Sequence, residues 1–177
     1  MSSTKVITGK VRFSYAHVFE PSAINEGDDK KYSVSILVPK KDLETLARIK
    51  NAIEAATQEG KGKWNGKIPT VLKLPLRDGD AERPDDEAYE GMMFLNASSK
   101  NRPGIVDENT DPVMSKDDFY SGCFGRASVN FYAFSVSGNK GIAVGLNNLQ
   151  KLEDGDSLSG GGSSASDDFG SDDDLLG

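Results

Sequence analysis

The chain has 177 residues, with 21 lysines and arginines against 28 aspartates and glutamates, and a net charge of −7. This length suits one domain with a substantial core and leaves little room for two. A single cysteine, Cys123, excludes an internal disulfide framework. The N-terminus has no apolar run typical of a signal peptide, and the longest apolar stretch, 35–38, is too short to cross a bilayer. We therefore expect a soluble, intracellular protein.

The charges are unevenly distributed along the chain. The last 25 residues, Glu153–Gly177, carry eight acids and no base. Removing those eight acids leaves 21 bases against 20 acids in residues 1–152, a net charge of +1. The last part also contains a glycine- and serine-rich run and few large apolar residues, so it cannot bury enough surface to fold. We predict one folded domain over 1–152, followed over 153–177 by a flexible Gly/Ser linker and a disordered acidic tail.

Two strands are predicted before the first helix. Apolar side chains alternate with polar ones from Val6 to Tyr15 and again from Lys31 to Val38, which is the period of a half-buried strand. The predicted inward residues are Ile7, Val11, Phe13, Tyr15, Tyr32, Val34, Ile36 and Val38, with Ser33 and Ser35 among the outward ones. Residues 20–29 contain a proline, a glycine and a charge cluster, so they are predicted to form a loop.

One main helix is predicted over about 41–58. Its apolar stripe recurs at steps of three or four residues and consists of Leu43, Leu46, Ile49, Ile53 and Ala56. An irregular stretch, 61–89, follows, with short strands predicted at Thr70–Leu74 and Gly91–Ser98, and 101–118 is predicted to be a loop.

Two longer strands end the domain. Gly125–Val136 and Gly141–Asn148 alternate in the same way, and the residues between them, 137–140, predict a tight hairpin turn. Five or more short strands with a single helix predict a mainly β fold, an OB-fold-like closed barrel. A β-sandwich with an inserted helix is the alternative.

Catalytic and metal-binding patterns are weak. His17 is the only histidine, and Cys123 has no partners for a zinc site. The acids between Asp78 and Asp86 flank a glycine and a proline, which is typical of a solvated loop. A calcium-loop spacing that starts at Asp107 has Pro112 where glycine is needed. We predict a protein that is not an enzyme and uses neither a metal nor a cofactor; a metal-dependent nuclease built on the first acid cluster is a rival hypothesis.

Basic and aromatic residues make a stronger pattern. Single-stranded nucleic acid is bound by aromatic rings that stack on bases and by cations that follow the phosphates. On the long strand predicted over Gly125–Val136, Arg126, Asn130 and Tyr132 share one face. Trp64 lies in a polar, basic segment that is a poor setting for a core tryptophan. The predicted DNA-binding residues are Lys10, Arg12, Lys31, Lys63, Trp64, Lys67, Arg77, Lys100, Arg102, Arg126, Asn130 and Tyr132.

Several segments, in order, resemble a family of phage-encoded single-stranded DNA-binding proteins long described as a domain of unknown function. These segments are Pro75–Asp80, Tyr89–Asp107, Tyr120–Phe134 and Gly138–Asp156, and the likeness runs from the KVRFSYAHVFEP opening through LNNLQKL. The resemblance implies an OB-fold protein that coats and protects single strands during phage replication, recombination or repair. It also implies a location in the cytoplasm of the infected bacterial host.

The acidic tail is predicted to compete with DNA for the basic residues and to recruit replication or recombination proteins. Its predicted contact residues are Asp167, Asp168, Phe169, Asp172, Asp173, Asp174, Leu175 and Leu176. Single-stranded DNA is the predicted partner, bound with little sequence preference, and no membrane is involved. Weaker binding of duplex DNA and a homodimer both stay open. The alternative function is a β-rich interaction or virion-structural protein without DNA binding.

Overall fold

The computed structural model describes residues 4–23, 27 and 29–158. Its strands are β1 (Lys5–Ile7), β2 (Val11–Ser22), β3 (Lys31–Pro39), β4 (Arg77–Asp78), β5 (Met92–Ser99), β6 (Gly104–Val106), β7 (Phe124–Val136) and β8 (Asn139–Glu153). Its helices are α1 (Leu43–Glu59) and α2 (Gly79–Glu82), with 3₁₀ turns η1 (Gly60–Trp64) and η2 (Glu87–Tyr89).

Five of the strands close into a barrel. β2 pairs with β3, β3 with β5, β5 with β8, β8 with β7, and β7 again with β2. Four of these pairings are antiparallel, and β5 with β8 is parallel. This closed order, with its one parallel pairing, is the arrangement of a five-stranded Greek-key barrel and confirms the predicted OB-fold-like architecture. The parallel seam has one register pair in the described part of the chain, Ser98 with Gly145.

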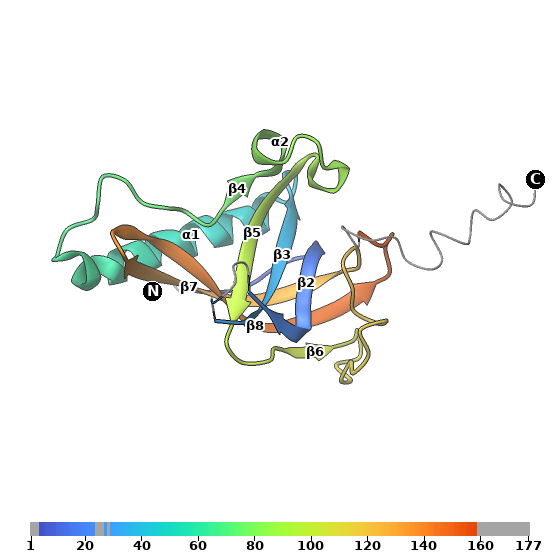
Figure 1. Cartoon of the computed structure of the whole chain (residues 1–177). Helices are drawn as coiled ribbons and strands as arrows, with labels where there is room; N and C mark the ends of the chain where they lie inside the picture. Colours follow the sequence, from blue (N-terminus) through green and yellow to red (C-terminus); the bar gives the residue numbers. More distant parts are fainter. Residues whose placement is uncertain (1–3, 24–26, 28, 159–177) are drawn as a thin grey trace, which may run out of the picture.

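The β7–β8 hairpin is longer than the barrel and forms an arm. Its two-residue turn, Ser137 and Gly138, has φ values of 50° and 81°, which suit the turn that matches the twist of a hairpin. The predicted hairpin is therefore confirmed. Figure 1 shows α1 lying along this arm, and both extend to the same side of the barrel.

Helix α1 begins after Asp42, whose carboxylate accepts a hydrogen bond from the Thr45 backbone N–H at 3.1 Å. Its buried stripe includes Leu46, Ile49 and Ala56, as predicted. Leu43 was expected in the same stripe, but it is 73% exposed because the buried face of α1 is centred on Thr45, Ile49, Ala52 and Ala56, and Leu43 lies outside it.

The inward pattern of the first strand holds for Val11 and Phe13 and is wrong at both ends. Ile7 is 47% exposed because the chain turns after β1 and buries Thr8 instead, whose hydroxyl accepts a hydrogen bond from the Ala127 N–H at 3.0 Å. Tyr15 is also 47% exposed, because a register shift interrupts β2 at this point. A strand bulge turns a side chain to the other face, and the alternation of the sequence does not reveal it.

The outer face of β3 and β5 is covered at one end. The segment that contains α2 and η2 folds over it, and Leu37, Tyr89 and Phe94 form a small second core there. The Tyr89 hydroxyl donates to Ser35 Oγ at 3.0 Å. Ser35 was expected on the solvent side of its strand but is 2% exposed for this reason.

Two predictions about the irregular segments are corrected. Residues 70–74 form no strand; Lys73 alone makes a bridge to Gly141, and its N–H donates to the Lys140 carbonyl oxygen at 2.9 Å. The predicted loop over 101–118 contains the short strand β6, which pairs with the end of β8. Both segments depend on partners far along the chain, which local composition does not specify.

Candidate nucleic-acid interface

Two cavities lie side by side on the outer face of the barrel and share Asn96 and Ser98. The first, of about 500 Å³, is lined by Tyr15, His17, Ser22, Ala23, Ser33, Val34, Ser35, Arg83, Asn96, Ala97 and Ser98. The second, of about 530 Å³, is lined by Lys73, Leu74, Pro75, Arg77, Asn96, Ser98, Ile142, Ala143 and Val144. Together they form one depression from β2 to β8, which we call the groove.

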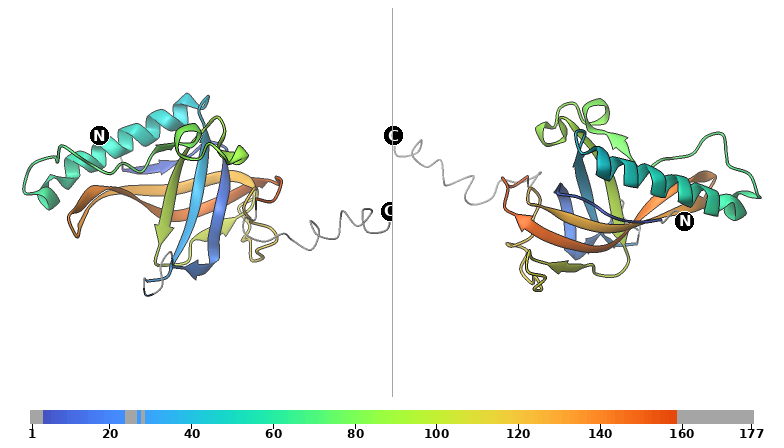
Figure 2. Two further views of the ribbon diagram at one scale, coloured as in Figure 1. Left: turned by 45° about the horizontal axis from the view of Figure 1, so that its top comes forward. Right: turned by 180° about the vertical axis from the view of Figure 1, so that it is seen from behind.

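The floor of the groove consists mainly of short side chains. The left view of Figure 2 shows β5, β3 and β2 side by side, with the β7–β8 hairpin crossing behind them. Ser33, Asn96 and Ser98 contribute to the floor from β3 and β5, and Ala143 contributes from β8. Short side chains let a ligand approach the sheet closely, and their hydroxyl and amide groups offer hydrogen bonds.

A tyrosine stands on either side of this floor. Tyr15 lines the groove from β2 and is 47% exposed. Tyr132, one of the predicted DNA-binding residues, is 45% exposed and pairs across the hairpin with Ala143 of the groove lining. Its ring lies beside Gly145, since a Cβ added there would be 3.6 Å from Tyr132 Cε1. Both exposed rings can therefore accept a stacked base.

Cations also reach the groove. Arg77, a predicted contact, lines the second cavity, where its guanidinium lies 5.5 Å from the Phe94 ring centroid and pairs with Glu82 at 2.6 Å. Lys31 is the cross-strand partner of Ser22, which lines the first cavity. These positions place positive charge beside the floor.

Two more predicted cations, Lys100 and Arg102, follow the end of β5. Both are exposed, and the Arg102 guanidinium lies 5.4 Å from the ring centroid of Phe19 in β2. They extend the positive charge past the end of the groove at which Ser98 lies.

Lys10 and Arg12 lie elsewhere and hold protein groups. Lys10 forms an ion pair with Glu153. Arg12 donates from Nε to the Gly122 carbonyl oxygen at 3.1 Å and from a terminal nitrogen to that of Asp156 at 2.9 Å. In the structure they hold the end of β8, the segment before β7 and the chain that follows β8, and neither lines the groove.

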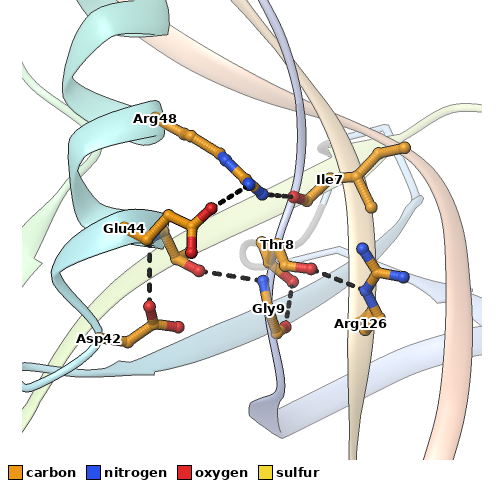
Figure 3. Close-up of polar contacts among 8 residues, drawn as sticks. Ile7, Thr8, Gly9, Asp42, Glu44, Arg48 and Arg126 are labelled. Carbon is orange, nitrogen blue, oxygen red and sulfur yellow. Dashed lines mark hydrogen bonds and ion pairs between the residues drawn. The ribbon is translucent and has the colours of Figure 1, made fainter.

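Arg126, a predicted DNA contact, is exposed, does not line the groove, and joins β7 to the residue that follows β1. Figure 3 shows its Nε donating to the Thr8 carbonyl oxygen, at 2.9 Å. In the same region the Gly9 N–H donates to Thr45 Oγ1 at 3.0 Å, which ties the segment after β1 to α1. Asn130, also predicted, is exposed and is the strand partner of both Lys5 and Gly145.

The prediction that Trp64 stacks on bases is corrected. Its side chain is 3% exposed and belongs to the main core, and its Nε1–H donates to the Phe134 carbonyl oxygen at 3.1 Å. The neighbouring Lys63 donates to the Ala133 carbonyl oxygen at 2.8 Å, and Lys67 is exposed. The polar segment around Trp64 fastens η1 to β7, so its tryptophan has no free face for a base.

Several groove residues are absent from the predicted DNA-binding set, among them Tyr15, Arg83 and Asn96. The sequence favoured a core position for Tyr15 and a stacking role only second, and it did not single out Arg83 or Asn96. The alternation of β5 does place Asn96 outward, between the buried Leu95 and Ala97, so its exposure was accessible to pattern reasoning. Arg83 had no such signal, because it lies among acids in an irregular segment.

Asp78 and Asp80, the first two acids of the cluster between Asp78 and Asp86, form ion pairs with a lysine. Lys40 Nζ lies 2.8 Å from Asp78 and 2.6 Å from Asp80. Hydrogen bonds from Lys40 lower the pKa of both carboxyls, and the same bonds raise the pKa of Lys40. Asp107 accepts hydrogen bonds from the backbone of its own turn. Among the residues that the structure describes, no three histidine, cysteine or acidic side chains gather as a metal site would require.

The chain that follows β8 lies against the barrel. Tyr120 donates to Asp154 at 2.9 Å, and the Leu158 N–H donates to the Ser121 carbonyl oxygen at 2.8 Å. Burial is the largest single influence on the Lys151 pKa and lowers it, but the hydrogen bond to Asp154 and the attraction of nearby negative charge together outweigh burial, so the Lys151 pKa is raised. Leu158 shares a surface hollow with Arg83, which also lines the groove. The last described residue therefore lies in a hollow that has Arg83 in common with the groove.

The tail residues predicted to contact partners, between Asp167 and Leu176, lie outside the described residues. Within the described ranges, no helix is long and apolar enough to cross a membrane.

Comparison with known proteins gives a consistent family. The family model of the single-stranded DNA-binding protein of Enterobacter phage Enc34 matches residues 4–176. Protein p50 of Acyrthosiphon pisum secondary endosymbiont phage 1 is 34% identical over 175 residues, which are 93% of this chain and 92% of that protein.

Solved structures agree with this assignment. The single-stranded DNA-binding protein of bacteriophage Enc34, in complex with single-stranded DNA, superimposes with a TM-score of 0.74 and 25% identity, over 88% of this chain and 90% of that one. The fold is also similar to that of gp2.5, the single-stranded DNA-binding protein of bacteriophage T7, with a TM-score of 0.60 and 13% identity over 93% and 99% of the two chains. This chain therefore belongs to the Enc34 family of phage single-stranded DNA-binding proteins.

Proposed function

We propose that this protein coats single-stranded DNA in the groove, with little sequence preference, during phage DNA replication, recombination or repair in the host cytoplasm. The observation that carries the proposal is the groove itself, with its short polar floor, an exposed tyrosine on either side and cations beside it. A relative solved with single-stranded DNA supports the choice of ligand.

The chemistry of the groove favours binding without a sequence code. Tyrosine rings stack on any base because every base has a π-face, and each stacked base contributes about 1–3 kcal/mol. Lysine and arginine follow the phosphates, which carry no sequence information. Asn96 and the floor serines can donate and accept hydrogen bonds with several base edges, so they add affinity without selecting one base.

We further propose that the acidic tail competes with DNA for the groove and recruits replication or recombination proteins once DNA displaces it. Support comes from the position of Leu158, after which the tail continues: it lines a surface hollow together with Arg83, and Arg83 also lines the groove. Eight acids in residues 153–177 supply a polyanion of the same sign as the phosphates. Such competition is ionic and weakens as salt screens the charges.

The proposed role is binding without catalysis. The acid cluster that a nuclease would need is engaged, since Lys40 bridges Asp78 and Asp80. A cation bound there would first have to displace the lysine, so the cluster is better explained as a fastener between the α2 segment and the end of β3.

A titration tests the proposed function. Fluorescein-labelled oligo-dT and a matched duplex are titrated with the protein at two salt concentrations, and binding is followed by fluorescence anisotropy. Lys73→Ala and Arg77→Ala should weaken oligo-dT binding and flatten the log–log salt dependence by about 0.7 for each lost phosphate contact. Lys50→Ala, which removes an exposed lysine of α1 outside the groove, is the matched control.

Two outcomes would contradict the proposal. If neither the full-length protein nor a variant truncated after Leu158 binds oligo-dT, the interaction or virion-structural alternative is favoured. If both proteins bind but the control variant loses as much affinity as the groove variants, DNA follows another surface.

A further inference from the structure

Tyr15 has an unusual backbone for a bulky residue inside a strand. Its φ is 48°, in the left-handed region that side chains other than glycine and asparagine rarely adopt. The described residues hold three other non-glycine positions of this kind, Asn65, Thr110 and Ser137, and all three lie in turns or caps. Such strain persists only where the surrounding structure imposes it, and it concentrates at functional sites.

The strain changes where the Tyr15 ring lies. Regular alternation from Phe13, which is fully buried, would point Tyr15 into the barrel. The register shift between Ser14 and His17 puts it in the groove instead, and Ala16 packs against the core in its place. The backbone of the bulge is satisfied, because the Ala16 N–H donates to Ser121 Oγ at 3.0 Å.

Arg83 holds the exposed ring. Its guanidinium carbon lies 5.4 Å from the Tyr15 ring centroid, and a terminal nitrogen is 3.4 Å from the Tyr15 hydroxyl. The same guanidinium is 5.4 Å from the Tyr89 ring and 5.9 Å from the Phe94 ring, so it bridges Tyr15 to the small second core. Fixing a side chain before binding removes part of the entropy that a ligand would otherwise have to offset.

We propose that Tyr15 is the stacking platform by which the groove selects single-stranded over duplex DNA, and that Arg83 is its positioning residue. A base offers a free face to a tyrosine only when it is unstacked from its neighbours, and in a duplex both faces are covered. The inference rests on the proposed function, because it names the group that gives that site its preference for single strands.

Three variants distinguish the effect of the Tyr15 ring on DNA binding from its effect on the stability of the fold. Tyr15→Gly removes the ring and accepts the positive φ without strain. Tyr15→Asn also removes the ring and tolerates the left-handed region, so it serves if the glycine variant folds poorly. Tyr15→Phe keeps the ring and loses only the hydroxyl. Thermal unfolding followed by circular dichroism establishes which variants are folded.

Each folded variant is titrated into oligo-dT, into an abasic oligonucleotide of the same length, and into a duplex. Loss of one stacked base should weaken oligo-dT binding by roughly 5- to 150-fold in Tyr15→Gly and Tyr15→Asn. The affinities for the abasic strand and for the duplex should change less than twofold. The slope of log affinity against log salt concentration should also change less than twofold. Tyr15→Phe should bind oligo-dT within about threefold of the parent, because its ring can still stack.

The outcomes are distinguishable. Unchanged oligo-dT affinity in both ring-free variants overturns the inference, as does an equal loss on the oligo-dT and abasic strands, which would indicate a structural role. Failure of the parent protein to bind oligo-dT instead refutes the proposed function itself.

Discussion

Trp64 lies where α1 and η1 pack against β7, and its burial there gives a testable prediction. Trp64 is 3% exposed, and its Nε1–H donates to the Phe134 carbonyl oxygen at 3.1 Å. Its ring also packs on the end of α1, since a Cβ added at Gly60 would lie 3.0 Å from Trp64 Cη2. Replacing it therefore perturbs the junction of α1, η1 and β7 without touching the groove.

The expected magnitudes follow from this environment. Replacing a buried tryptophan by alanine costs about 3–5 kcal/mol, because the removed ring leaves a cavity. Trp64→Phe keeps most of the packing and loses one hydrogen bond, whose net contribution is about 0.5–1.5 kcal/mol, with a further loss for the smaller ring. Since small domains are stable by about 5–15 kcal/mol, the alanine variant should be close to unfolding and the phenylalanine variant should remain folded.

Urea denaturation followed by far-ultraviolet circular dichroism measures both variants against the parent. DNA binding is measured separately, and Trp64→Phe should bind oligo-dT with the parental affinity. In the parent protein, tryptophan emission should not change when the groove is saturated with oligo-dT. Quenching of that emission by DNA, or weaker binding by a folded Trp64→Phe variant, would refute the assignment of Trp64 to the core.

Three other predictions follow from the same structure. Gly145→Ala should fold within about 1 kcal/mol of the parent in urea, because its new methyl group meets only ordinary contacts, whereas the methyl of Gly141→Ala would lie 2.3 Å from a backbone oxygen and should lower both stability and DNA affinity. Lys40→Met should lower the stability of the fold at pH values between the ordinary pKa of aspartate and that of lysine. The difference in stability from the parent should disappear as pH falls through the lowered pKa values of the two carboxylate partners of Lys40. Unfolding midpoints measured across this pH range test the prediction. Truncation after Leu158 should tighten oligo-dT binding at low salt and have little effect at high salt, and equal affinities at low salt would contradict tail competition.

The elements with strong local periodicity could be predicted from the sequence. The helix was expected over about 41–58 and spans Leu43–Glu59, and the final hairpin forms at the expected turn. Both depend on contacts between residues close in the chain. The position of Tyr15 could not be predicted, because a bulge shifts the alternation and depends on pairing with β3.

The candidate site was only partly accessible for a related reason. Composition identified basic and aromatic residues, and three of them, Lys31, Arg77 and Tyr132, lie in or beside the groove. It could not distinguish cations that face the groove from those that bind carbonyl oxygens of the protein, as Arg126 does at Thr8. The prediction for Trp64 was wrong because the residues that flank it are polar, and its burial depends on a partner 70 residues away in the chain.

The closure of the barrel is unequal around its circumference. β3 and β5 pair at every residue from Tyr32 to Pro39, whereas β5 and β8 meet in the one register pair Ser98 with Gly145. Opening at this parallel seam breaks few backbone hydrogen bonds, so the amides there should exchange with solvent sooner than those of β3. Because Ser98 lines both cavities of the groove, a nucleic acid strand bound across it would contact β5 and β8 together. The bound strand would then hold β5 and β8 together where they share the fewest backbone pairings. The parallel seam would therefore open more often in the free protein than in the complex.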